Sequence, residues 1–249
     1  MAGHSKWANI KHRKGRQDAK RGKMFSKATR ELMLAAKLGG GDPDMNPRLR
    51  MAIDSAKEIN LPKDKIETAI KKGTGEISSG TLEEVAYEGY GPGGVALLVE
   101  AVTDSKNRTV SEIRKIFSKG GGNLGEYGCV SWMFQTFGVL SFDKSKYSED
   151  DLLEAGLDAG VDDVIDDGQY WEVRTSPDDF IQAKQAFQEA GIEIESAEVA
   201  KIPHTYMSLD KETAEKALKL YEHLDDHDDV QKVYTNFEIP DELYNELRN

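Results

Sequence analysis

The chain has 249 residues, of which 38% are hydrophobic and 31% are charged, a composition typical of a globular protein with two or three cores. Its longest apolar run, residues 95–99, is far shorter than the ~20 residues that span a bilayer, and residues 1–7 contain no apolar segment typical of a secretory signal. A single cysteine, Cys129, excludes an intramolecular disulfide. We therefore expect a cytoplasmic protein.

The net charge of −12 is distributed very unevenly along the chain. Residues 1–75 carry 18 Lys and Arg against 8 Asp and Glu, a net charge of +10, whereas the rest of the chain carries −22. The first 30 residues contain ten Lys and Arg and a single acid, Asp18. Because salt screens charges beyond roughly 8 Å, a basic module can attract phosphate groups although the remaining chain is acidic. This asymmetry predicts a polyanionic partner.

A basic tail followed by three helices is expected in residues 1–78. Apolar residues at three- and four-residue spacing predict the first helix over 18–38, and three glycines end it. Asn46 followed by Pro47 is typical of a helix start, and a shorter helix follows Pro62. Three helices of this length predict a small bundle.

Residues 79–137 have the pattern of strands. Two strands are expected at 83–90 and 94–103, joined by a Gly-Pro-Gly-Gly turn. A helix over 108–119 and a further strand over 129–134 follow.

Residues 138–203 show a β-α-β-β-α-β order, which is typical of the ferredoxin-like arrangement, and they contain 17 acidic against 5 basic residues. Residues 204–249 add a strand, a helix and a strand, which would complete a second such set together with 79–137. The predicted fold class is therefore α+β: an N-terminal three-helix domain (1–78) followed by two ferredoxin-like α/β domains, the second inserted in the first. A linear chain of three domains is the alternative.

The basic N-terminal segment is the strongest candidate site. Lys and Arg neutralise phosphates, and Trp7 offers a flat face on which a base can stack. The alternative is a solvated tail with Trp7 folded back onto the protein. Nucleic-acid binding is favoured because the basic side chains continue from the tail onto one side of the first helix. The candidate residues are Lys6, Trp7, Lys11, His12, Arg13, Lys14, Arg16, Lys20, Arg21, Lys23, Lys27 and Arg30.

The helix over 108–119 has a basic side in an acidic region, which makes Arg108 and Arg114 candidates for a second polyanion contact. Ion pairs with acids of a neighbouring domain are an equally favoured interpretation. A helix-turn-helix around 46–72 would present only lysines on its third helix, which suits phosphate contacts rather than base reading.

Catalytic and metal-binding patterns are weak. His223 and His227 are four residues apart, but they lie in the run of acids at 222–229, which is typical of a solvated helix end. Cys129 lies in an apolar segment, which favours a buried structural thiol. We expect no cofactor, no metal site and no enzymatic activity.

Several segments, in order along the chain, resemble the YebC family: residues 2–14, 18–23, 38–43, 46–50, 87–94, 107–109 and 121–125. The resemblance covers essentially the full chain. It implies a helical domain and two α/β domains, one inserted in the other. It also implies a cytoplasmic bacterial protein described as a DNA-binding regulator of transcription, whereas the mitochondrial relatives resemble translational activators.

The expected function is therefore a nucleic-acid-binding regulator of gene expression, with DNA as the first candidate partner. Binding would be mainly electrostatic, and specificity would come from DNA shape or from a homodimer. The alternative is a translation factor associated with rRNA or the ribosome, because a basic tail that carries an aromatic residue suits irregular RNA. The acidic residues 138–203 are expected to supply solubility; the alternatives are that they mimic nucleic acid or dock on a basic protein.

Overall fold

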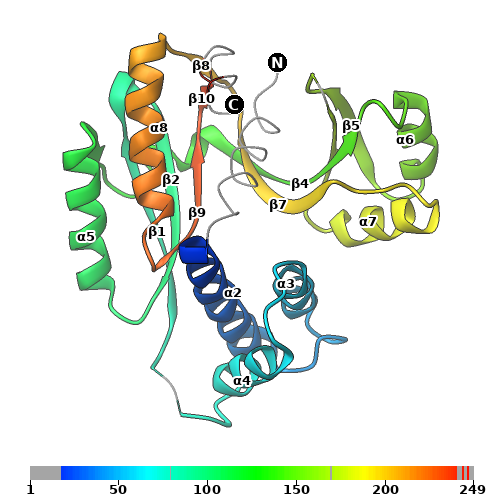
Figure 1. The fold of residues 1–249 in the computed structure, drawn as a ribbon, viewed down its shortest axis with the longest axis horizontal. Coiled ribbons are helices and arrows are strands. Elements are labelled where there is room, and N and C mark those ends of the chain that lie inside the picture. Colours follow the sequence, from blue (N-terminus) through cyan, green and yellow to red (C-terminus); the bar gives the residue numbers. More distant parts are fainter. Residues whose placement is uncertain (1–17, 79, 169, 240–242, 244–245, 247–249) are drawn as a thin grey trace. The chain divides into compact units, whose positions relative to one another are not determined.

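The computed structural model describes residues 18–78, 80–168, 170–239, 243 and 246 (Figure 1). The described residues form two compact units. The N-terminal unit comprises residues up to 129 together with 215–233, and the C-terminal unit comprises 130–214 together with the described residues from 234 onward. Among the described helices, none has both the length and the hydropathy to cross a membrane.

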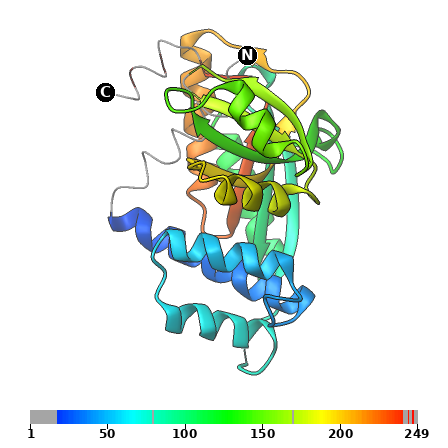
Figure 2. The same cartoon turned by 90° about the vertical axis from the view of Figure 1, so that its right-hand side faces the viewer.

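The predicted three-helix arrangement is confirmed in the N-terminal unit. Its helices are α2 (Asp18–Gly39), α3 (Pro47–Glu58) and α4 (Lys63–Gly73), and α2 packs against both of the others (Figure 2). Leu32, Leu49 and Ile66, one from each helix, are buried in the shared core. The bundle therefore forms because each helix has one apolar face and none can bury it alone.

Asn46 fixes the start of α3, as the sequence predicts. Its side-chain oxygen accepts a hydrogen bond from the Leu49 N–H at 3.1 Å. Its side-chain amide donates to the carbonyls of Ala35 and Gly40, each at 2.8 Å. One buried side chain thus caps α3 and ties it to the end of α2.

The N-terminal unit also contains a four-stranded sheet with the order β3-β1-β2-β9. The strands are β1 (Glu83–Tyr90), β2 (Ala96–Thr103), β3 (Asn123–Leu124) and β9 (Val230–Thr235), and β1 pairs antiparallel with β2 and β3. Helices α5 (Lys106–Lys119) and α8 (Lys211–Asp225) lie beside this sheet (Figure 1). They meet where Leu220 of α8 packs against Gly120 at the end of α5.

This sheet departs from a regular ferredoxin-like order in one strand. The short strand before α8, β8 (Met207–Ser208), pairs in parallel with β10 (Phe237–Glu238) and not with the four-stranded sheet. The place beside β2 is taken by β1 instead. This pairing is favourable because a tight turn at Pro92–Gly94 joins β1 and β2, so their hairpin closes with little loss of chain entropy.

The second four-stranded sheet lies in the C-terminal unit and has the order β5-β6-β4-β7. It is built from β4 (Phe134–Asp143), α6 (Glu149–Gly156), β5 (Val161–Asp166), β6 (Tyr170–Thr175), α7 (Phe180–Glu189) and β7 (Ser196–Pro203). All its pairings are antiparallel, which is the ferredoxin-like topology that the sequence predicts. The α+β fold class is therefore confirmed.

The strand expected over residues 129–134 is wrong in its first part. The chain turns at 126–129, forms a short 3-10 turn at Ser131–Met133, and enters β4 only at Phe134. Gly128 has a φ of +85°, a conformation that breaks a strand. The carboxylate of buried Glu88 accepts a hydrogen bond from the Gly128 N–H at 2.8 Å and so holds the turn.

Candidate nucleic-acid interface

Many of the predicted contact residues lie outside the part of the chain that the structure describes: Lys6, Trp7, Lys11, His12, Arg13, Lys14 and Arg16. Lys20 and Arg21 belong to α2, but their side chains are likewise outside the described part. The described candidates are three cations of α2 and two of α5.

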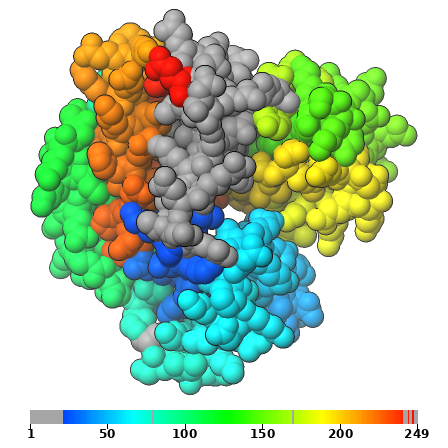
Figure 3. Space-filling view, viewed as in Figure 1, coloured from blue at the N-terminus to red at the C-terminus, as the bar shows by residue number. Residues whose placement is uncertain are grey.

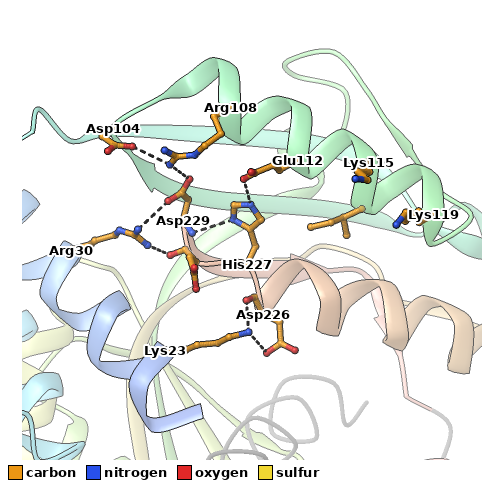
Figure 4. A pocket seen from close by; sticks show the side chains of 12 residues that line it. Lys23, Arg30, Asp104, Arg108, Glu112, Lys115, Lys119, Asp226, His227 and Asp229 are labelled. Atoms are coloured by element: carbon orange, nitrogen blue, oxygen red, sulfur yellow. Dashed lines mark hydrogen bonds and ion pairs between the residues drawn. The ribbon is translucent and has the colours of Figure 1, made fainter. Parts of the chain in front are cut away.

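The α2 cations face an acidic turn of the same unit, residues 225–229, which joins α8 to β9 (Figure 4). In the space-filling view, blue atoms of α2 lie beside the orange atoms at the end of α8 (Figure 3). Lys23 Nζ donates to the Asp226 carbonyl at 2.8 Å and lies 3.6 Å from the Asp226 carboxylate. Lys27 Nζ donates to the Asp225 carbonyl at 2.7 Å and to its carboxylate at 3.0 Å. These predicted phosphate contacts are thus engaged with the protein's own oxygens.

Asp229 is the centre of the acidic turn, and its side chain is only 3% exposed. Its Oδ1 lies 3.1 Å from Arg30 Nη2, and its Oδ2 accepts from Arg108 at 2.8 Å and from the Thr109 hydroxyl at 2.7 Å. Burial opposes ionisation, but the hydrogen bonds from Arg108 and Thr109 and the charges of both arginines hold the pKa of Asp229 below its usual value. The carbonyl of Asp229 also accepts from the Val102 N–H of β2 at 2.8 Å.

Arg108 therefore makes ion pairs within its own unit, with Asp229 and with Asp104 at 3.0 Å. The hydrogen bond with Asp229 is the main cause that raises the pKa of Arg108. Arg114, the other α5 candidate, is exposed and makes no ion pair with a described residue. Arg108 and Arg114, which the sequence predicts as one polyanion contact, thus have different environments.

His227 is held at both ring nitrogens. Nδ1 accepts from the Asp229 N–H at 3.1 Å, and Nε2 lies 2.9 Å from a carboxylate oxygen of Glu112. Because Nδ1 is an acceptor, the neutral ring carries its proton on Nε2 and donates it to Glu112. The expectation of a solvated helix end is therefore wrong for His227 and Asp229, which are part of a hydrogen-bonded network.

Glu112, His227 and Asp229 place their ligand atoms within 4.8 Å of one another, a grouping that can hold a metal ion. The contacts of Asp229 fit this use poorly. Two arginines and a threonine hydroxyl already satisfy its carboxylate, so a cation would have to displace a guanidinium. The residues fit an internal polar network better than a metal site.

A cavity of about 750 Å³ lies between the first half of α2, helix α5 and the acidic turn (Figure 4). Lys115, Ile116 and Lys119 line it from α5. Both lysines are exposed, and neither makes an ion pair with a described residue. Figure 4 shows them toward the end of α5 that is remote from Arg108. The cavity thus has a neutralised end at Asp229 and a cationic end at the two lysines.

The sequence did not indicate that the acidic turn would be the partner of α2. About 200 residues separate Lys23 and Lys27 from the acids that they contact. The only available signal was the run itself, four aspartates within residues 225–229. Such a run at a helix C-terminus is destabilised both by self-repulsion and by the helix dipole, so it requires cations from elsewhere in the fold.

Comparisons with known proteins match nearly all of the chain. Residues 5–76 match the family model described as the TACO1/YebC protein N-terminal domain, and residues 82–237 match that of the TACO1/YebC second and third domain. Relatives named probable transcriptional regulatory protein include one from Maridesulfovibrio salexigens, 57% identical over 249 residues and 100% of both chains. Another, from Solidesulfovibrio magneticus, is 57% identical over 98% of this chain and 100% of its own.

A solved structure is similar as well. The crystal structure of a conserved hypothetical protein from Aquifex aeolicus superposes with a TM-score of 0.80 at 46% sequence identity. The match covers 90% of this chain and 93% of the other.

Proposed function

Because the chain belongs to the TACO1/YebC family, we propose that it is a non-enzymatic regulator of gene expression that binds nucleic acid, with DNA as its first candidate partner. The names of the bacterial relatives support a role in transcription. The cytoplasmic location and a homodimer stay predictions from the sequence.

The observation that carries this proposal is the segregation of charge. Residues 1–75 have a net charge of +10, whereas the remainder of the chain has −22. Lys and Arg bind the phosphate backbone by releasing its condensed counterions, whatever the base sequence. The acidic turn engages Lys23, Lys27 and Arg30, so this proposal draws its positive charge from the residues before α2 and from Arg114, Lys115 and Lys119 of α5.

Titration of labelled duplex DNA with the full chain at several salt concentrations tests the proposal. We expect log K to fall with log salt, with a slope of about −0.9 per phosphate contacted on a duplex. Deletion of residues 1–16 removes five of the ten Lys and Arg in the first 30 residues and should abolish most of the affinity. Affinity that does not depend on salt, or full binding by the truncated chain, would contradict the proposal.

Trp7 favours RNA as a second candidate. An aromatic residue within a basic tail can stack on an unpaired base, and such bases are common in structured RNA. The corresponding function is a translation factor that associates with rRNA or the ribosome. Trp7→Ala should then weaken binding to single strands more than binding to a duplex. Crosslinking in cells, followed by sequencing of the attached nucleic acid, distinguishes the two functions. Promoter DNA supports the regulator of transcription, and rRNA supports the translation factor.

A further inference from the structure

We propose that the cavity between α2 and α5 takes the phosphate backbone of a nucleic-acid strand. Lys115 and Lys119, here called the lysine pair, make its first contacts. The acidic turn competes with the backbone for the cations of α2. This inference rests on the proposed function and assigns a docking surface and an internal competitor to it.

The lysine pair has the geometry of a phosphate contact. The two residues are four apart in α5, so their side chains project from the same face of the helix, roughly 5–6 Å apart at Cβ. Both line the cavity, and neither makes an ion pair with a described residue. Each ammonium group is therefore available to contact a polyanion.

The acidic turn presents to α2 the kind of atoms that a phosphate backbone would present. Lys23 and Lys27 are bound by carbonyl and carboxylate oxygens, which are anionic or strongly polar acceptors like phosphate oxygens. Replacing one set of oxygens by the other leaves each lysine with a partner. The exchange therefore leaves neither ammonium group of α2 unpaired, and its cost in free energy is small.

The contacts of the acidic turn differ in how readily they can exchange. The outer pair, Lys23 with Asp226, is exposed to 43% and 56%, and such pairs contribute little to stability and weaken as salt rises. The inner carboxylate of Asp229 is almost fully buried and bound by two arginines. We infer that the outer contacts yield to phosphate while the inner network keeps α2, α5 and β9 together.

The first test removes the lysine pair from the full chain. Lys115→Gln with Lys119→Gln should lower the affinity for labelled duplex DNA about tenfold and reduce the salt slope by about two phosphate contacts. The matched control is Lys216→Gln with Lys219→Gln, two exposed lysines of α8 that do not line the cavity, which changes the net charge equally. We expect the control to lower the affinity less than about threefold.

The second test weakens the competitor. Asp225→Asn with Asp226→Asn should raise the affinity for the same duplex several-fold, because fewer carboxylates compete for Lys23 and Lys27. The control is Asp162→Asn with Asp163→Asn, two exposed residues of β5, which gives the same change in net charge. Circular dichroism of each variant verifies that it has the wild-type secondary structure. If the Asp225 and Asp226 variant unfolds, Asp226→Asn alone, at the exposed pair, provides the same test.

The outcomes separate this inference from the proposed function. A larger loss for the lysine pair than for its control, with a gain for the acidic-turn variant, supports the inference. Equal effects of variants and controls would mean that only net charge matters and would overturn it, although the proposed function would stand. If the wild-type chain shows no salt-dependent binding to duplex DNA or single-stranded RNA, both are refuted.

Discussion

At the scale of single residues, Asp229 is the most connected side chain of the candidate interface. One carboxylate binds Arg30 of α2, Arg108 and Thr109 of α5, while its own carbonyl binds β2. A buried carboxylate with several donors is stable, but its loss leaves its partners without an anion. Asp229 therefore acts as a structural anchor that positions the more exposed cations around it.

Asp229→Asn should lower the free energy of unfolding by about 2 kcal/mol at neutral pH, because both arginines lose their buried counter-charge. The pKa of Asp229 is lowered in the fold, so its stabilising effect is present above the unfolded value of about 3.9. This contribution is lost as the pH falls below that value and through the lower folded pKa. Urea unfolding of both proteins at pH 7 and near pH 3 measures this. A difference that persists unchanged in acid would contradict the assignment.

The sequence predicts that Asn46 caps α3, but it does not predict that the same side chain binds the end of α2. Asn46→Ala should cost about 2–3 kcal/mol, because it removes the cap of α3 and the two donors to the carbonyls at the end of α2. Asn46→Ser keeps an oxygen for capping but loses the amide, so about half of that loss is expected. Thermal unfolding, monitored by circular dichroism, compares the stability of the two variants and the wild type. Equal midpoints for Asn46→Ser and the wild type would show that the amide contributes nothing.

At the scale of elements, the close approach of α4 to α2 depends on a glycine. A Cβ added at Gly73 would lie 2.3 Å from the Met33 carbonyl oxygen and 2.7 Å from the Ala36 Cβ. Gly73→Ala should therefore push the helices apart and destabilise the protein by about 1–3 kcal/mol.

Gly22 of α2 is the matched control, because no atom lies within 4 Å of its added Cβ. Gly22→Ala should stabilise the helix by about 0.5–1 kcal/mol. Opposite signs for the two substitutions in urea unfolding are the expected result. Equal effects would mean that helix propensity, and not packing, decides at Gly73.

The elements that the sequence predicted well are those with local signals. Asn46 and Pro47 mark the start of α3, and the Gly-Pro-Gly-Gly turn marks the β1–β2 hairpin, because caps and tight turns depend on adjacent residues. The expected strand at 129–134 failed at its first residues because a distant buried group, Glu88, holds a turn there. The partner of the α2 cations was missed for the same reason, since charge composition does not reveal which distant acids fold back.

At the scale of the whole molecule, the insertion of the second sheet has a geometric basis. In the β4–β7 pair, Phe134 lies opposite Pro203, and the His204 N–H donates to the Met133 carbonyl at 2.9 Å. The chain thus enters and leaves this sheet at neighbouring points, which is the arrangement that allows one domain to be inserted into another. The predicted boundaries of 1–78, 79–137 with 204–249, and 138–203 remain predictions.

A fragment of residues 130–206 tests whether this segment folds on its own. Its helices α6 and α7 cover one face of the sheet, where the rings of Phe142 and Phe187 lie 4.6 Å apart in a closed core. We expect dispersed amide resonances and a cooperative thermal transition. The midpoint should lie below that of the full chain, because Ala200 and Ile202 pack in a cluster with Tyr234, which the fragment lacks.

Phe187→Ala provides the internal comparison for this fragment. The side chain is fully buried, so its truncation should cost about 3–5 kcal/mol in the fragment and a similar amount in the same segment of the full chain. A fragment of about 77 residues buries only about 60% of its unfolded surface and has little stability to spare, so the variant fragment should be largely unfolded. If the wild-type fragment is itself unfolded, the sheet depends on the cluster around Tyr234, and the inserted segment is not an autonomous domain.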